Sequence, residues 1–303
     1  MQSRKNAVLL LHFTVFIWGF TGILGKLIEQ GTFQLVYTRT VIAMAGLALA
    51  AWWMKKDLSP RTPNLKHYLL TSLIITAHWI TFYGAIKIST ATIAAACLST
   101  STVFTALLEP FWFKRKTRIY EVVLGVIVVA ALIMIFGLET EHRLGIAVAT
   151  ASALFSAWFN VINGVLVKRD NALRISFYEM GGVVALIGIY LLAIGELPPP
   201  LWQLPTDDII YQLLLGLVCT SFAFVAGIVV MRQLSPFTVM LTVNLEPIYT
   251  IVIALMIWGA EEQLRIGSYL GIALILACLF VNGWLQRRKT AQQVVEPDPL
   301  AHG

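Results

Sequence analysis

The acidic residue Glu246 stands in the middle of a long apolar run, residues 236–258. Four polar residues of this run recur at every fourth position, at Thr238, Thr242, Glu246 and Thr250. On a helix, this spacing places them on one face. A charge inside a membrane costs at least about 2.5–3.5 kcal/mol, so this face must meet protein or a water-filled cavity. Two interpretations stay open: Glu246 binds a substrate amine or a coupling proton, or it makes a structural hydrogen bond between helices.

Two further charges interrupt apolar runs. Arg39 lies near the beginning of the run 33–54, where a guanidinium can bind a carboxylate or a phosphate through paired hydrogen bonds. Two alternatives to this binding role are that Arg39 pairs with a glutamate for structural reasons, or that its side chain extends toward the lipid headgroups. Glu179 lies next to Tyr178 in the run 175–194. It is a gating candidate, and the alternative is an ion pair at the inner end of this run, where Glu179 lies.

Amides, histidine and tryptophans complete the set of candidates. Asn160 and Asn163 share one face of the run 145–167, where they line a cavity or link helices. His78 and Trp79 lie deep in their run, as core residues or as part of a binding site, and the tryptophans at 18 and 158 lie at equivalent mid-depth positions. The predicted substrate-binding and translocation residues are Trp18, Arg39, His78, Trp79, Trp158, Asn160, Asn163, Thr242, Glu246 and Tyr249, with Glu246 as the proton-coupling candidate.

The composition requires a membrane around these residues. Of the 303 residues, 58% are hydrophobic and 13% are charged, and the mean hydropathy is +0.79. Soluble domains carry roughly 25% charged residues, so too few polar side chains remain here for a surface in water. A membrane span needs about 20 apolar residues. The sequence predicts ten spans, at residues 7–26, 33–54, 67–86, 91–113, 120–136, 145–167, 175–194, 209–231, 236–258 and 266–285.

The ten predicted spans form one five-helix unit written twice. A constant offset of 146 residues aligns Ser89 with Ser235 and Gly125 with Gly271, together with the order of apolar runs and breaks around them. An odd number of spans in each unit makes the second copy enter the membrane upside down, which is typical of secondary transporters. The predicted fold is therefore all-α, with units at 1–138 and 139–289 and a disordered tail at 290–303.

Charge predicts the orientation of these spans. With the N-terminus inside, 17 of the 22 Lys and Arg residues fall in the inside segments and 4 in the outside segments, while Arg39 lies within a span. Short basic loops resist translocation, so both termini are expected in the cytoplasm. The basic run 114–118 lacks interleaved aromatic residues suited to bases, and we expect anionic lipid beside it rather than nucleic acid.

The chemistry of an enzyme is missing from the sequence. The five histidines are scattered, with no spacing suited to a metal, and no GxxxxGK[ST] motif occurs. The three cysteines lie far apart in apolar runs and are expected to be buried and free. We therefore expect neither an enzyme nor a metal or cofactor.

Several of these segments resemble the ten-helix drug/metabolite transporter superfamily, and in particular its EamA-like branch. They are FIWGFTGILGKL, YTRTVIA, AIKISTATIAA and, most clearly, NLEPIYTIVIALMIWGAEEQLRIGSYLGIALILACLFV. The resemblance covers about residues 6–288. The first copy departs from this pattern in two ways. Ser101 stands where Pro247 stands in the second copy, and a basic run stands where the second copy has a Gly-Glu element, in WGAEEQLRIG.

The resemblance implies a transporter of small metabolites in a membrane. Members move amino acids, sugars, nucleotide sugars and other metabolites, and export is the commoner direction. We expect a secondary active transporter, proton-coupled or passive, in the inner membrane of a bacterium, as a monomer or homodimer. A passive facilitator or a lipid flippase is the alternative, and an intramembrane enzyme is disfavoured.

Overall fold

The computed structural model describes residues 4–59, 64–113 and 119–295, and its regular secondary structure in these ranges is helical. The α-helices in chain order are α1 (Arg4–Trp18), α2 (Thr21–Leu27), α3 (Thr32–Trp53), α4 (Leu65–Ile88), α5 (Ala91–Leu98), α6 (Ser101–Phe113), α7 (Ile119–Leu138), α8 (Arg143–Leu166), α9 (Ala172–Ile194), α10 (Thr206–Leu213), α11 (Ala223–Val230), α12 (Pro236–Val243), α13 (Leu245–Trp258) and α14 (Ile266–Val295). A π-helix, Leu214–Phe222, joins α10 to α11.

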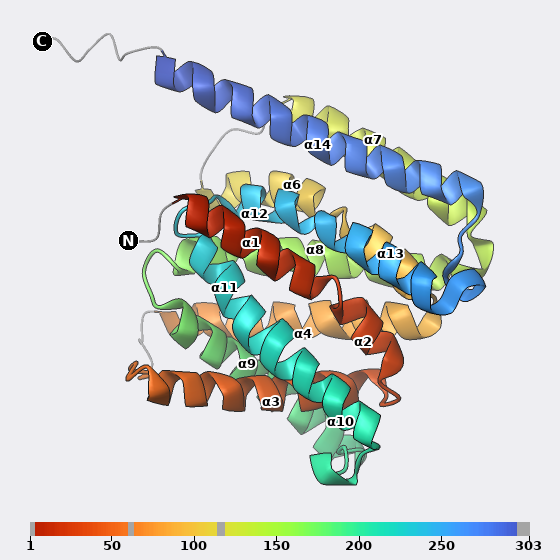
Figure 1. The fold of residues 1–303 in the computed structure, drawn as a ribbon. Coiled ribbons are helices and arrows are strands. Elements are labelled where there is room, and N and C mark those ends of the chain that lie inside the picture. The colour runs from red at the N-terminus through yellow and green to blue at the C-terminus, as the bar shows by residue number, and fades with distance from the viewer. Residues whose placement is uncertain (1–3, 60–63, 114–118, 296–303) are drawn as a thin grey trace, which may run out of the picture.

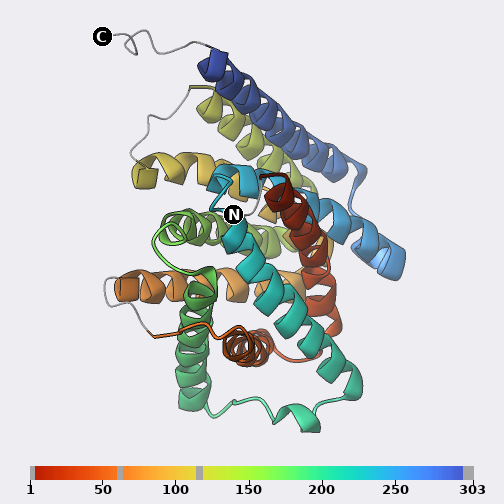
Figure 2. The same ribbon diagram turned by 60° about the vertical axis from the view of Figure 1, so that its left-hand side comes forward.

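The helices form one bundle, with α7 and α14 paired at one edge (Figures 1 and 2). Within the bundle the helices cross, as α9 does over α4 in Figure 2. The beginning of α1 and the end of α14 lie at the same end of the bundle (Figure 1). The last helix continues to Val295, further than the predicted span. Residues 290–295 contain neither glycine nor proline, so nothing in this stretch ends the helix before Pro297.

Within the described residues, eight helical segments are long and apolar enough to cross a membrane. Each one overlaps a predicted span. The predicted spans 120–136 and 266–285 coincide with shorter apolar stretches, Val123–Ile135 and Ile266–Cys278. The prediction of an all-helical, multi-span chain is confirmed.

Several of the segments that were expected to be continuous helices are broken. The first segment breaks at Gly19–Phe20, the fourth at Ser99–Thr100 and the ninth at Asn244. The last break lies just before Pro247, which has no N–H to donate to the carbonyl of Val243. Hydroxyl groups bind carbonyls that precede the other breaks: Thr21 donates to Trp18 O at 2.7 Å and Thr100 to Cys97 O at 2.7 Å. Backbone breaks at membrane depth are tolerated where protein supplies such partners.

Glycines bring neighbouring helices into close contact. The last helix packs against α7, where Gly267 and Gly271 lie against Leu138 and Ile135. On α9, Gly182 lies so close to Ser72 of α4 that a β-carbon would overlap its side chain. Close approach of backbones at small residues is a main source of helix association in membranes.

A cluster of polar side chains ties two loops together at the end of the bundle where α1 begins. The buried Asp170 carboxylate accepts hydrogen bonds from Tyr68 and from Asn64 Nδ2, the latter at 3.0 Å. Arg174 donates to Asp170 at 2.6 Å and to Asp57 at 3.0 Å. Burial raises the pKa of Asp170, but the hydrogen bonds outweigh it, so that pKa lies below its ordinary value. We call these five residues the Asp170 cluster.

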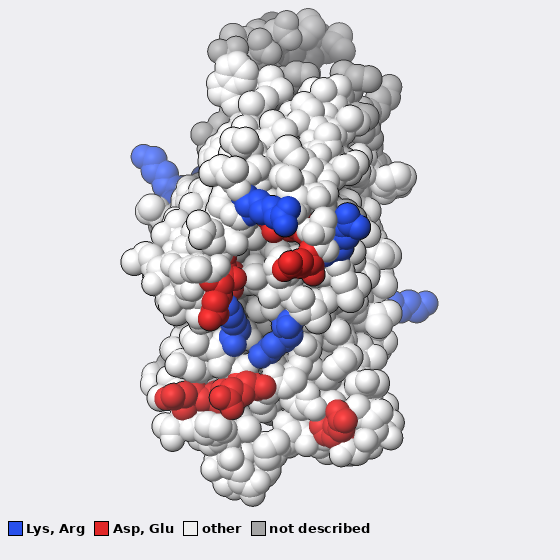
Figure 3. Space-filling model, turned by 90° about the vertical axis from the view of Figure 1, so that its right-hand side faces the viewer, with Lys and Arg blue, Asp and Glu red and all other residues white. Residues whose placement is uncertain are grey.

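A second group of charges lies at the opposite end, where acidic and basic side chains are neighbours on the surface (Figure 3). The carboxylate of Glu262 is fully buried. It accepts hydrogen bonds from the backbone N–H groups of Ala91 and Thr92, at 3.2 and 2.8 Å, and from Lys26 Nζ at 3.0 Å. One carboxylate therefore connects the end of α2, the beginning of α5 and the turn after α13.

The close contact at Gly182 yields a prediction about stability. We expect Gly182→Ala to lower the free energy of unfolding by about 1–3 kcal/mol, because the new methyl group overpacks the α9–α4 contact. The neighbouring Gly181→Ala is the matched control, since its β-carbon would lie 3.7 Å from Met44, an ordinary contact. Unfolding in detergent measures both, and equal stability of the two variants would contradict the packing described here.

The Asp170 cluster yields a prediction about pH. A carboxyl with a lowered pKa stabilises the fold above its unfolded pKa of about 3.9, and this contribution is lost as the pH falls through the lower folded pKa. Asp170→Asn should therefore lose about 1.5–3 kcal/mol of stability at neutral pH and show a weaker loss on acidification below about pH 4. The exposed Asp207→Asn is the control. Parallel pH–stability curves for wild type and Asp170→Asn would disprove the assignment.

Candidate functional site

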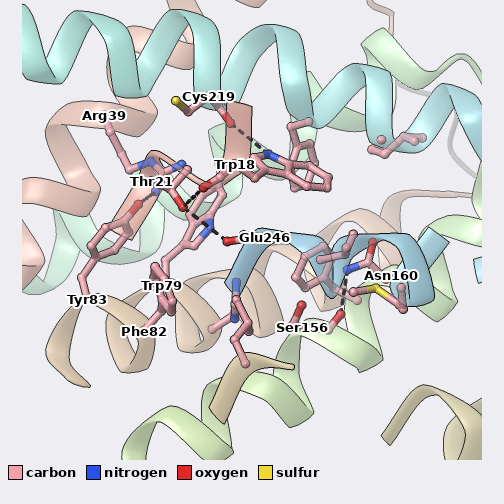
Figure 4. Close-up of a pocket in the computed structure, with 18 residues that line it drawn as sticks. Trp18, Thr21, Arg39, Trp79, Phe82, Tyr83, Ser156, Asn160, Cys219 and Glu246 are labelled. Atoms are coloured by element: carbon pink, nitrogen blue, oxygen red, sulfur yellow. Dashed lines mark hydrogen bonds between the residues drawn. The ribbon is translucent and has the colours of Figure 1, made fainter. Parts of the chain in front are cut away.

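A pocket of about 80 Å³ lies between the two halves of the chain (Figure 4). Its walls come from both halves: α1–α5 on one side, and α8, the π-helix, α11, α12 and α13 on the other. The aromatic residues of the wall are Trp18, Trp79, Phe82, Tyr83, Phe159 and Phe224. The polar and charged residues are Thr21, Arg39, His78, Ser156, Asn160 and Glu246.

Glu246 reaches this pocket because two broken helices face each other. The break at Asn244 places Glu246 in the first turn of α13, where the helix dipole favours a negative charge. Thr21, just after the break of the first segment, donates to Glu246 Oε1 at 3.5 Å, and Thr250 donates to Gly19 O at 2.9 Å. A β-carbon at Gly19 would lie 2.6 Å from Tyr249 Cβ, so only glycine permits this approach.

Arg39 projects into the pocket from α3 and is 2% exposed. Its guanidinium donates to Thr220 Oγ1 at 3.2 Å from Nε and 2.6 Å from Nη2, and to the hydroxyl of Tyr83. The same group lies over the ring of Trp79, 4.5 Å from its centroid. In the described part of the chain, hydroxyls and aromatic faces surround this arginine, in place of the glutamate or headgroup partners that were its alternatives.

The π-helix places the partner of Arg39. Thr220 donates to Leu215 O at 2.7 Å and Ser221 to Gly216 O at 3.0 Å, each five residues back along the chain. Ser221 also donates to Ala43 O of α3 at 2.9 Å. The widened turn thus fixes the hydroxyl of Thr220 toward α3, as π-turns commonly do at functional sites.

The pocket therefore combines one cationic and one acidic side chain with aromatic walls. In Figure 4, Arg39, Thr21 and Glu246 lie along one side, with Trp18 and Trp79 next to them. A carboxylate fits the guanidinium, an ammonium group fits Glu246 and aromatic faces, and an apolar group fits the remaining wall. The arrangement can bind a small molecule that carries both charges.

His78 and Asn160 also line the pocket. His78 Nδ1 lies 2.8 Å from Ser152 Oγ and 3.0 Å from Ser152 O, and the imidazole packs against Phe82 and Phe159. Asn160 donates to Ser156 O at 2.9 Å. Both polar groups have partners within the protein, which fixes the wall rather than leaving it mobile.

Other predicted residues lie outside the pocket lining. Tyr249 packs edge-on against Phe16, with ring centroids 5.5 Å apart, and Thr242 bonds the carbonyl of Thr238. Trp158 is half-buried elsewhere on α8. Asn163 is buried beside Glu179, to which it donates at 3.3 Å. An ion pair was the alternative to a gating role for Glu179. In the described residues, Glu179 instead accepts this hydrogen bond from the amide of Asn163.

Several lining residues were missed by the sequence reasoning. Tyr83 follows Trp79 by four residues, so helical spacing could have placed both on one face. Thr21 could have been found from the glycine-flanked break that precedes it. Cys219 and Phe224 could not, because the π-helix changes which residues of this segment face inward.

Comparisons with known proteins agree with this architecture. The model of the EamA-like transporter family matches residues 5–137 and 143–284, one match in each half of the chain. A solved structure, described as "Crystal structure of protein", shares the fold with a TM-score of 0.68 and 17% identity, over 94% of this chain and 99% of that one. Comparison with curated proteins finds no match.

The two family matches together cover most of the chain, and the described residues contain eight segments able to span a membrane. The chain is an integral multi-pass membrane protein that belongs to the EamA-like transporter family.

Proposed function

We propose that this protein is a secondary active transporter of a small zwitterionic metabolite, such as an amino acid or a related compound. The observation that carries the proposal is the presence of Arg39 and Glu246 in one buried pocket with aromatic walls. Arg39 binds the substrate carboxylate, Glu246 binds its ammonium group, and Trp18 and Trp79 contact its side chain.

Alternating access fits the position of the pocket. Its charges come from opposite halves, Arg39 from the first and Glu246 from the second, so relative movement of the halves changes the site directly. At about 80 Å³, the pocket in this conformation is smaller than the 300–1,000 Å³ typical of small-molecule sites. Substrate entry therefore requires the halves to separate.

The finer features of the proposal come from the sequence and the family. Ten spans with both termini in the cytoplasm follow from the charge asymmetry of the loops. A bacterial inner membrane and outward transport are what the family resemblance implies. Glu246 is the residue at which a proton and the substrate amine compete, because a carboxyl that is protonated no longer binds an ammonium group through its charge.

Binding tests the role of Arg39. We expect Arg39→Lys to weaken the affinity for a bound amino acid by about 10-fold or more, because lysine keeps the charge but loses the paired hydrogen bonds. The measurement is calorimetric titration of the purified protein against a panel of amino acids and their amides. The exposed Arg265→Lys is the control. Equal affinity for an amino acid and its amide would exclude the proposed carboxylate contact.

Flux tests the role of Glu246. In inverted membrane vesicles, a proton gradient should drive uptake of labelled amino acids, and Glu246→Gln should abolish the gradient-driven part. The control is Glu261→Gln, whose side chain is 73% exposed. Uptake that ignores both the gradient and the mutation would identify a passive facilitator. Movement of a labelled lipid without amino-acid uptake would identify a flippase.

A further inference from the structure

A second buried acid lies outside the central pocket. Glu179 of α9 is 0% exposed, and its Oε2 accepts a hydrogen bond from Asn163 Nδ2 of α8 at 3.3 Å. The hydroxyl of Thr71 on α4 also lies beside this carboxyl, but it donates to the carbonyl oxygens of His67 and Tyr68, at 2.8 and 3.1 Å. Asn163 is also 0% exposed. The other oxygen of each side chain, Glu179 Oε1 and Asn163 Oδ1, has no hydrogen-bond partner among the described residues. Two buried acceptors are thus left without a donor.

The helices around α9 offer this carboxyl no cation in the described residues. On α3, Arg39 is bound within the central pocket, and Tyr37 packs near Gly188. On α4, Tyr68 bonds Asp170 and His78 bonds Ser152, while the buried Nδ1 of His67 has no hydrogen-bond partner among the described residues and so does not bind Glu179. The two lysines of α4 lie elsewhere: Lys66 is exposed, and Lys87 donates to Ile28 O near the other end of the helix. α11 carries no titratable residue, and the charged residue of α8, Arg143, begins that helix at its far end.

On α9 itself, the nearest cation is Arg174, whose guanidinium is bound to Asp170 and Asp57. An ionised carboxylate in such a place would be an unpaired buried charge, which proteins avoid. Neutralisation must therefore come from a small cation or a proton.

A proton on Glu179 would resolve both unpartnered oxygens at once. A carboxylic acid and a carboxamide form a ring of two hydrogen bonds: the amide N–H donates to one carboxyl oxygen, and the carboxyl O–H donates to the amide oxygen. The first bond is present. In the second bond, Glu179 Oε1–H would donate to Asn163 Oδ1, and these are the two oxygens that now lack partners. We propose that Glu179, paired with Asn163, is a proton-binding site separate from the central pocket.

The location of this site points to its role. The next residue back, Tyr178, donates to Leu58 O at 2.7 Å and stacks on Tyr68, with ring centroids 5.3 Å apart. Tyr68 in turn donates to Asp170. Glu179 is therefore the chain neighbour of a residue that packs on the Asp170 cluster, at the end of the bundle where α1 begins.

Release of the proton from Glu179 then requires that the bundle opens at the end where the Asp170 cluster lies. When the carboxyl gives its proton to water, the carboxylate left behind must be hydrated, and water reaches it only if α9 separates from α4 and α8. The proton on Glu179 thus favours the closed Asp170 cluster, and its loss accompanies opening. This coupling role rests on the proposed transport function, whereas the proton site itself does not.

Infrared spectroscopy of the purified full-length protein tests the site without transport. At neutral pH, exposed glutamates are ionised, so a protonated carboxyl gives a distinct C=O band. We expect a band that Glu179→Gln removes, while Glu246→Gln and the matched buried control Glu109→Gln retain it. Asn163→Leu should shift the band to the frequency of an acid without a hydrogen bond, which also tests the pair if Glu179→Gln does not fold. Absence of any component sensitive to these two substitutions would overturn the proposal.

Hydrogen–deuterium exchange of the same band tests the link to opening. Asp57→Asn weakens the Asp170 cluster from its exposed side, so exchange at Glu179 should become about fivefold faster. Glu261→Gln, at the opposite end, should leave the rate unchanged. An unchanged rate in Asp57→Asn would disprove the link to opening. A protein that shows the Glu179 band but no amino-acid flux would refute the transport proposal and leave the proton site standing.

Discussion

Hydrocarbon offers no water to a polar group, so every charge and every free carbonyl inside this bundle needs a partner from the protein. The broken helices show the consequence. At each break near the pocket, a threonine hydroxyl binds a carbonyl that the helix has released, and the same break aims a side chain at the cavity. The groups that satisfy the backbone therefore also form the site. The hydroxyl of Thr21 hydrogen-bonds the carbonyl of Trp18 and also contacts the carboxylate of Glu246.

The two halves share a framework but differ in charge. Arg39 and Glu179 are each the eighth residue of their helix, α3 and α9, in the first and the second half. At the break of the fourth and ninth segments, Thr100 of the first half aligns with Glu246 of the second under the 146-residue offset. Of these four residues, Arg39 and Glu246 line the pocket, so its positive charge comes from the first half and its negative charge from the second.

Much of this was predictable from the sequence, because a membrane restricts what apolar runs can do. The helical class, the positions of the spans and the inward direction of Glu246 all follow from periodicity and the cost of buried charge. The positions of Tyr249 and Trp158 outside the pocket did not follow, since equal depth along a helix says nothing about which neighbour a ring meets. Breaks within spans were also missed, because serine and threonine can stabilise either a straight or a broken helix.

The π-helix Leu214–Phe222 makes the pocket depend on chain length as well as on composition. Each residue of an α-helix turns the chain by about 100°, so the extra residue in a widened turn rotates everything beyond it relative to α10. Thr220 meets Arg39 only because of this offset. A relative with identical side chains but one residue fewer here would present another face of the segment to α3 and would have to fix its arginine differently. Substrate preference in this fold can therefore diverge by a single insertion or deletion, without any change in the residues that contact the substrate.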